Sequence, residues 1–232
     1  MSEYPGLKEL KTKGVKLLIF DLDGTVLDSM NVWNKVDIVF LGRYGYEVTP
    51  DYTDVVKRVS VDEAALYTKQ RYRIPLSPAE IMQEWDKMVS GFYRNEVRLK
   101  PGVRSYLEDA KKLGFRMGVA TALTRNNAVS GLVSNNILKI FDAVITLEDV
   151  GKKIDKSSPD IFNKVLNYVN AMGDSINPSQ TLVYDDVAAA ACGARNGGFL
   201  TCAVYDEIGC GDPLKWESFA AECDYSVKTF QD

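Results

Sequence analysis

Residues 15–29 read VKLLIFDLDGTVLDS, an apolar run that ends abruptly in two carboxylates, a glycine and a threonine. The run from Val15 to Phe20 has the length of a buried strand. Open α/β sheets bind ligands at the carboxyl ends of such strands. Because side chains alternate along an extended chain, Asp21 and Asp23 face the same side. Two carboxylates so close repel each other, so we expect a bound cation or a shared proton to stabilise them.

A solvated Asp-Gly turn is the alternative interpretation of this stretch, since that dipeptide is common in turns. The second apolar pair and the Asp28-Ser29 that follows it make the site interpretation the stronger one.

Composition places the chain among globular proteins. It has 232 residues, 46% of them hydrophobic and 26% charged, enough for one large domain or a core with a small second domain. The net charge of −4 disfavours nucleic acid as a partner, because binding a phosphate backbone requires a basic face. Residues 1–13 lack the apolar segment of a signal peptide, and no apolar run approaches membrane-spanning length. We therefore expect a cytoplasmic protein with no membrane partner, and a monomer by default.

Cysteine and histidine usage narrows the chemistry. The four cysteines show no C-x-x-C spacing, which is typical of free thiols rather than of a zinc site or redox pair. The chain has no histidine, which excludes Ser-His-Asp catalysis and imidazole-ligated metals. Catalysis must then use carboxylates, lysine, hydroxyls and a metal or cofactor.

Helical periodicity without a strong strand runs from Asn31 to Glu96. The pattern predicts four helices: one from Val32 to the glycines at 42 and 45, one over 52–59, one opening at Val61, and one from Ser77 towards Glu96.

After the linker 99–103, strands and helices alternate, which predicts parallel β-α-β units and hence a doubly wound, Rossmann-like α/β core. The expected helices cover 103–113, 125–135, 159–170 and 187–196, and the expected strands cover 115–121, 143–146, 181–184, 199–204 and 225–228.

Polar side chains follow four of the expected strands: Asp21 and Asp23, then Thr121, Lys156, and Asp185-Asp186. Parallel strands end at one edge of a sheet, so these side chains should lie together. Carboxylates suit Mg²⁺, and a hydroxyl with an ammonium suits phosphate oxygens. The set predicts phosphoryl transfer, in which one carboxylate can act as nucleophile and another as acid/base.

The lysine of this set is not fixed by pattern alone, because it belongs to the run Lys152-Lys153-Ile154-Asp155-Lys156. Its spacing to Pro159-Asp160 favours Lys156.

Four motifs in this order resemble the haloacid dehalogenase superfamily of phosphatases. They are DLDGTV at 21–26, Thr121 closing MGVA at 117–120, Lys156 before SSPD at 157–160, and VYDD at 183–186. The helical insert resembles the small four-helix cap of the β-phosphoglucomutase-like group. The resemblance implies a catalytic core at 1–30 and 99–232 and a cap at 31–98.

For the acids, the resemblance implies that Asp21 is the nucleophile and a Mg²⁺ ligand. Asp23 would be the acid/base, with its backbone carbonyl on the metal. Asp186 would be the direct metal carboxylate, and Asp185 would support the metal through water or through its ligands.

For the phosphate, the resemblance implies that Thr121 and the Ala122 N–H hold the transferring group and that Lys156 neutralises it and pairs with Asp21. Thr25 would lie in the flap over the site. Arg125 could contact substrate, or be a surface residue at a helix start.

The sequence departs from the family pattern at two motifs. Ser157 follows Lys156 where the family often has proline, and Val187 follows Asp186 where it often has serine. These departures affect the surroundings of the metal rather than the reaction class.

The resulting prediction is a Mg²⁺-dependent phosphatase acting on a small phosphorylated metabolite, such as a sugar phosphate, through an aspartyl-phosphate. A sugar-phosphate mutase is the alternative, but mutases of the similar group have a cap histidine twelve positions after the nucleophile, where this chain has Trp33. A signalling receiver fits less well, because receivers accept phosphate on the third strand and lack a helical insert of this size after the first. A silent phosphate-binding module should have lost one of the expected catalytic positions, and none is lost. A dehalogenase would need neither Asp23 nor a metal.

We also expect the cap to close over the site, with hinges near 29–31 and 99–102, and to set a substrate preference that these motifs do not reveal.

Overall fold

The computed structural model describes residues 6–56, 59, 61–151, 155–210 and 212–231. The chain divides into two compact units: a core unit of residues 1–30 and 97–232, and an insert unit of residues 31–96. Each is described by itself below.

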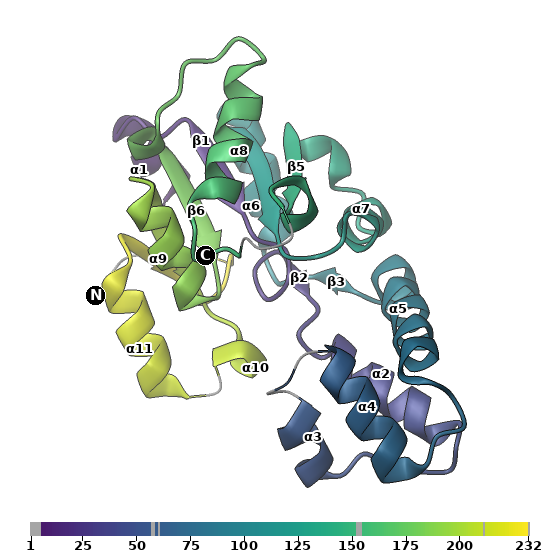
Figure 1. Cartoon of the computed structure of the whole chain (residues 1–232). Coiled ribbons are helices and arrows are strands. Elements are labelled where there is room, and N and C mark those ends of the chain that lie inside the picture. The colour runs from purple at the N-terminus through teal and green to yellow at the C-terminus, as the bar shows by residue number, and fades with distance from the viewer. Residues whose placement is uncertain (1–5, 57–58, 60, 152–154, 211, 232) are drawn as a thin grey trace. The chain divides into compact units, whose positions relative to one another are not determined.

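The core unit is built on a six-stranded sheet (Figure 1). Its order is β5-β4-β1-β6-β7-β8, and every neighbouring pair is parallel. All strands therefore end at the same edge, as the α/β prediction requires. The strands are β1 (Leu17–Phe20), β4 (Arg116–Thr121), β5 (Ala143–Thr146), β6 (Thr181–Asp185), β7 (Leu200–Val204) and β8 (Tyr225–Val227).

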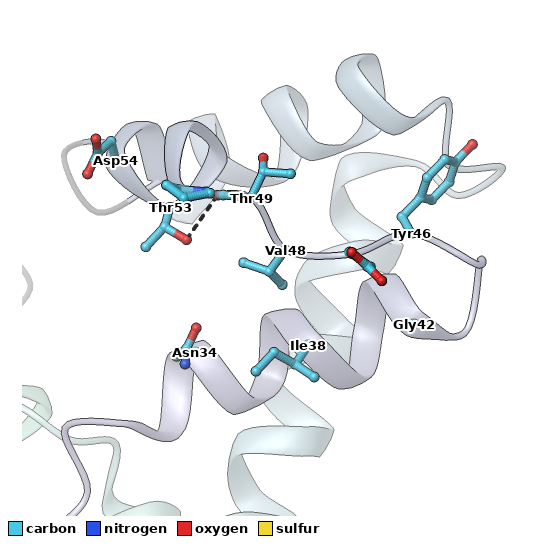
Figure 2. Close-up of a pocket in the computed structure, with 10 residues that line it drawn as sticks. Asn34, Ile38, Gly42, Tyr46, Val48, Thr49, Thr53 and Asp54 are labelled. Carbon is cyan, nitrogen blue, oxygen red and sulfur yellow. Dashed lines mark hydrogen bonds between the residues drawn. The ribbon is translucent and has the colours of Figure 1, made fainter.

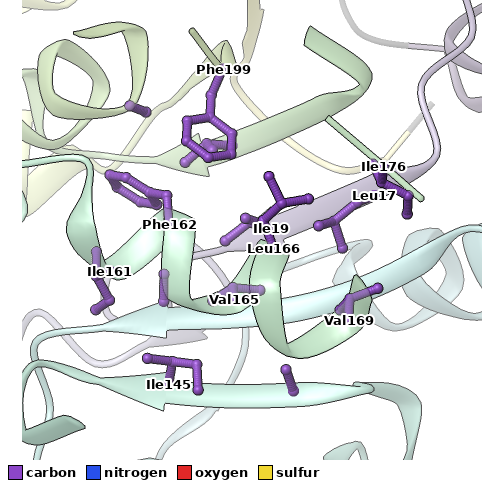
Figure 3. Packing of buried hydrophobic residues seen from close by; sticks show 14 of the residues in the cluster. Leu17, Ile19, Ile145, Ile161, Phe162, Val165, Leu166, Val169, Ile176 and Phe199 are labelled. Atoms are coloured by element: carbon purple, nitrogen blue, oxygen red, sulfur yellow. The ribbon is translucent and has the colours of Figure 1, made fainter. Parts of the chain in front are cut away.

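Strand β1 is central and buried on both faces, which explains its unbroken apolar sequence. Leu17 and Ile19 join a hydrophobic cluster with helices α8 (Asp160–Asn170) and α9 (Ala188–Asn196), shown in Figure 3. Phe20 has the opposite orientation and stacks on Tyr184 at a centroid distance of 4.5 Å. Helix α6 (Val103–Lys112) contributes Tyr106 to that aromatic group. Helix α7 (Arg125–Ser134) follows β4.

Several short elements were not predicted. Leu7–Thr12 forms helix α1, with Leu10 buried. Strands β2 (Leu27–Asp28) and β3 (Arg98–Leu99) pair antiparallel. Helices α10 (Glu207–Cys210) and α11 (Pro213–Glu222) precede β8, and 3₁₀ turns occupy Leu138–Ile140, Leu147–Asp149 and Pro178–Gln180.

The described residues of the insert unit form four helices and no strand, as predicted. They are α2 (Val32–Gly42), α3 (Pro50–Val56), α4 (Val61–Tyr72) and α5 (Pro78–Asn95). Ser77 and Glu80 form a reciprocal capping box at the start of α5. Helix α3 ends before the expected 59; residues 57, 58 and 60 lie outside the described part of the chain. Trp85 is buried, and Trp33, which is 50% exposed, packs edge-to-face against it.

Among the described helices, none combines the length and the apolar character that crossing a membrane would require.

Candidate active site

Asp21 is delivered by β1 to the carboxyl edge of the sheet. Its backbone N–H donates to the Tyr184 carbonyl at 2.9 Å, which continues the β1–β6 ladder past Phe20. The Lys156 ammonium lies 2.5 Å from Asp21 Oδ1 and 2.7 Å from Asp185 Oδ2, and it is almost fully buried. Lys156 therefore links the ends of two neighbouring strands. The alternatives Lys152 and Lys153 lie outside the described residues.

Three buried carboxylates form the centre of the site. One oxygen each of Asp21, Asp185 and Asp186 lies within 4.8 Å of the others. The second oxygen of Asp185 accepts the Val187 N–H at 3.0 Å. Among the described residues, Asp186 has no ion pair, so one ammonium faces three acids.

The electrostatics of this cluster suit a divalent cation. Burial raises the pKa of the Asp21 carboxyl well above its usual range, and the Lys156 ammonium opposes that shift. Burial and then the Asp185 charge raise the pKa of Asp186 to about 7. Mg²⁺ prefers oxygen ligands. Three carboxylates beside one ammonium leave negative charge that a divalent cation can neutralise. The residues present therefore fit a bound Mg²⁺.

Asp23 lies in a tight turn beyond Asp21. The turn is closed by the N–H groups of Val26 and Leu27, which donate to the Leu22 carbonyl. The Ser29 hydroxyl donates to Asp23 Oδ1 at 2.5 Å. Asp23 is half-buried, so its carboxyl is both held by a hydroxyl and open to solvent, as an acid/base requires.

Gly24 fits this turn for two reasons. Its φ is +73°, which disfavours other residues, and a Cβ at this position would lie 2.4 Å from Asp186 Oδ2. The turn after β1 thus lies directly against the Asp186 carboxylate at the end of β6.

The three candidate phosphate-binding groups differ in their surroundings. Thr121 ends β4 and is buried; its hydroxyl oxygen accepts the Leu123 N–H at 3.2 Å, which leaves its proton for another acceptor. Ala122 is exposed directly after β4. Thr25 is fully buried, and its hydroxyl has no hydrogen-bond partner among the described residues.

Arg125 is engaged elsewhere in the described structure. Its guanidinium forms an ion pair with Asp149 at 2.5 Å and its backbone N–H donates to Glu148. Arg125 therefore begins α7, after β4, and binds the 3₁₀ turn that follows β5; no described hydrogen bond or ion pair joins it to the carboxylate cluster.

Two further residues shape the site and escaped sequence reasoning. Ser29 was named only in the stretch after the first motif and in an expected hinge, although its hydroxyl donates to Asp23. Gly193, in α9, lies against the backbone of the Lys156 loop: a Cβ there would be 2.2 Å from the Lys156 carbonyl oxygen. A glycine inside an otherwise helical run is the available signal of such a close approach.

The insert unit contains a groove of about 700 Å³ between α2 and the segment that leads into α3 (Figure 2). Its charged lining residues are Glu47 and Asp54. Two acids repel a phosphorylated ligand, so this groove is not the candidate phosphate site.

The family model described as "Haloacid dehalogenase-like hydrolase" matches residues 18–204. The chain is similar to Protein CbbY of Rhodobacter capsulatus, with 26% identity over 85% of this chain and 88% of that protein. It is 22% identical to Pyrophosphatase PpaX of Halalkalibacterium halodurans over 94% of each chain.

A solved structure shows the same fold. Mutant CbbY of Rhodobacter sphaeroides, in complex with xylulose 1,5-bisphosphate, aligns with a TM-score of 0.69 at 18% identity, over 94% of this chain and 96% of that one.

Proposed function

The chain belongs to the haloacid dehalogenase-like hydrolase family, and from this premise we propose that it is a Mg²⁺-dependent phosphatase that cleaves small phosphoric monoesters through an aspartyl-phosphate on Asp21. The observation that carries the proposal is Lys156, whose buried ammonium bridges Asp21 and Asp185 beside Asp186, an acid with no ion pair in the described part of the chain. Phosphatases named among its relatives support the enzyme class.

In the first step, the Asp21 carboxylate attacks phosphorus, and the bond from phosphorus to the ester oxygen breaks. Asp23 gives its proton to the departing oxygen, which leaves as an alcohol. In the second step, Asp23 takes a proton from a water molecule as that water attacks the aspartyl-phosphate. Inorganic phosphate leaves and both carboxyl groups return to their starting states.

The phosphoryl group needs positive charge and hydrogen-bond donors as it transfers. Lys156 supplies the charge next to Asp21, while the Thr121 hydroxyl and the Ala122 N–H would supply donors at the end of β4. The Thr25 hydroxyl, for which the described residues provide no hydrogen-bond partner, is a further donor in the turn that carries Asp23.

Asp21, Asp185, Asp186 and the Asp23 carbonyl would hold the Mg²⁺. When bound, the ion would neutralise phosphate charge and keep the acids ionised.

The substrate class follows from the chemistry of the site and from the relatives. One relative is named a pyrophosphatase, another a phosphatase of phosphorylated carbohydrates, and a solved neighbour is complexed with a sugar bisphosphate. A small phosphorylated metabolite, such as a sugar phosphate, is the corresponding proposal here. The insert unit would act as a cap that selects it. Absence of histidine favours hydrolysis over mutase transfer.

The test is phosphate release from p-nitrophenyl phosphate and from a panel of phosphorylated sugars and pyrophosphate, with Mg²⁺ or with EDTA. We expect release only with Mg²⁺ and a loss of at least about 10³-fold in Asp21→Asn, because the nucleophile is removed. Asp109→Asn, an exposed acid of α6, is the matched control. β-Glucose 1-phosphate with its bisphosphate should yield free phosphate. Metal-independent release, or isomer without phosphate, would contradict the proposal.

A further inference from the structure

A second lysine of the core unit, Lys100, is as tightly held as Lys156. Its side chain is 14% exposed, and its ammonium donates to Gly24 O at 2.7 Å, Tyr205 O at 2.6 Å and Asp206 Oδ2 at 3.0 Å. An ammonium has three N–H donors, so all three are used. Lys100 thus binds two segments that are distant from it in the sequence. Gly24 lies 76 residues before it, and Tyr205 lies 105 residues after it.

Asp206, the acidic partner of Lys100, also binds the backbone of the segment that follows it. Asp206 is 5% exposed, and its Oδ1 accepts the N–H groups of Ile208 at 3.0 Å and Gly209 at 2.8 Å. One carboxylate oxygen therefore fixes the first turn of α10 while the other binds Lys100.

Both tethered segments lie against the same atom. A Cβ at Gly24 would lie 2.4 Å from Asp186 Oδ2, and one at Gly209 would lie 3.2 Å from that same oxygen. The backbones at Gly24 and Gly209 therefore both lie against the Asp186 carboxylate, which has no ion pair among the described residues. Lys100 anchors both glycine segments, but none of its described hydrogen bonds or ion pairs is with Asp186 itself.

We propose that Lys100 is a positioning residue for Asp186: through its bonds to the Gly24 carbonyl and to Asp206, it fixes the two glycine segments that determine where the Asp186 carboxylate lies. The inference rests on the proposed function, because it gives Asp186 a place in the reacting site. Groups that orient metal-binding carboxylates affect metal affinity or activity by about 10–100-fold when removed.

A general stabilising role would give a different pattern. A lysine that only supports folding would lower the unfolding temperature and leave Mg²⁺ affinity and kcat of the folded protein unchanged. A positioning residue lowers both in protein that remains folded, and has little effect on the KM of a small aryl phosphate.

The test compares Lys100→Met, Asp206→Asn and the double variant. Calorimetry without substrate measures Mg²⁺ binding, and p-nitrophenyl phosphate turnover measures kcat and KM. For Lys100→Met we expect Mg²⁺ binding about tenfold weaker and kcat reduced about 10–100-fold, with KM within about twofold. Asp206→Asn should act in the same direction, and the double variant should be no worse than Lys100→Met, because both break one unit. Lys112→Met, which removes the exposed partner of Asp109, should change nothing.

Gly209→Ala provides a second approach if Lys100→Met does not fold. It adds a Cβ against Asp186 Oδ2 without touching Lys100, and should also weaken Mg²⁺ binding and kcat. Folded variants with wild-type Mg²⁺ affinity and kcat would overturn the inference while leaving the proposed function standing. Wild-type protein that neither binds Mg²⁺ nor releases phosphate would contradict both.

Discussion

At the scale of single residues, Asp37 is a buried acid outside the candidate site. It lies in α2, 9% exposed, with its Oδ1 3.0 Å from the Tyr52 hydroxyl. Tyr52 also lies 2.9 Å from the Thr68 hydroxyl, which donates to the Ala64 carbonyl at 2.7 Å. The Tyr52 hydroxyl donates to Asp37 and so favours the ionised carboxylate, whereas burial favours the neutral acid and is the larger effect.

Asp37 should therefore make stability depend on pH. Burial raises its pKa from 3.8 to about 6, against the opposing Tyr52 hydrogen bond. Because burial raises the folded-state pKa, protonation of Asp37 stabilises the folded protein. This contribution is full below pH 3.8 and is lost as pH rises through 6. The shift corresponds to about 3 kcal/mol.

We expect Asp37→Asn, whose amide oxygen can still accept the Tyr52 O–H, to gain about 2.5 kcal/mol of unfolding free energy relative to wild type between pH 4 and pH 7.5. Urea titrations followed by tryptophan fluorescence can measure this, since Trp33 and Trp85 lie in the insert unit. Exposed Asp86→Asn should show a constant difference from wild type. An equally constant difference for Asp37→Asn would contradict the account.

Some site residues could be predicted and others could not, for a physical reason. Asp21, Lys156 and Asp185 were expected together because a parallel sheet brings strand ends to one edge, and the structure joins them. Their catalytic roles remain predictions. Lys100 had no such signal: its partners lie far along the chain, and a lysine before Pro-Gly is typical of an exposed linker.

At the scale of elements, α9 meets the Lys156 loop through a glycine. Besides the Lys156 carbonyl, a Cβ at Gly193 would lie 2.6 Å from the Ser157 carbonyl carbon, so backbone would have to move. Gly91 in α5 has no such neighbour: a Cβ there meets nothing within 4 Å.

These two helical glycines should respond oppositely to alanine. Gly193→Ala should destabilise the protein by about 1–3 kcal/mol through overpacking and should lower kcat by displacing Lys156. Gly91→Ala should stabilise it by about 0.5–1 kcal/mol, because alanine favours a helix interior. Thermal unfolding and p-nitrophenyl phosphate turnover check both. If Gly193→Ala were as stable and as active as wild type, the loop would not depend on this packing.

Long periodic elements were predicted well and short ones poorly. Helices α7 and α8 lie within a residue of their expected bounds. Strands β2 and β3 have two residues each and form only because they pair with each other. Helix α10 has four residues and is held by the Asp206 side chain, which is a tertiary cause rather than a local pattern.

At the scale of the whole molecule, β2 and β3 carry the chain out of and back into the core unit. Leu27 pairs with Leu99 and Asp28 with Arg98, antiparallel. The ends left by removing residues 31–96 are therefore adjacent within the core unit itself, and a short turn can join them.

We expect a variant with 31–96 replaced by Gly-Asn-Gly-Ser to keep the six-stranded core, as circular dichroism can show. If the insert selects substrate, this variant should either lose phosphatase activity or treat the members of a phosphorylated-metabolite panel more equally than wild type does. A folded variant with an unchanged kcat/KM ranking would contradict a selecting role for residues 31–96.

The central claim is that Asp21 carries the phosphoryl group. Wild type and Asp23→Asn, in which the acid/base is removed, would be mixed with substrate and Mg²⁺, quenched in acid and reduced with borohydride, which converts an aspartyl-phosphate to homoserine. Mass spectrometry of the peptide that contains residues 17–29 should then find homoserine at position 21, and none in Asp21→Asn. Phosphate release by wild type with no modification at position 21 in either protein would contradict the account.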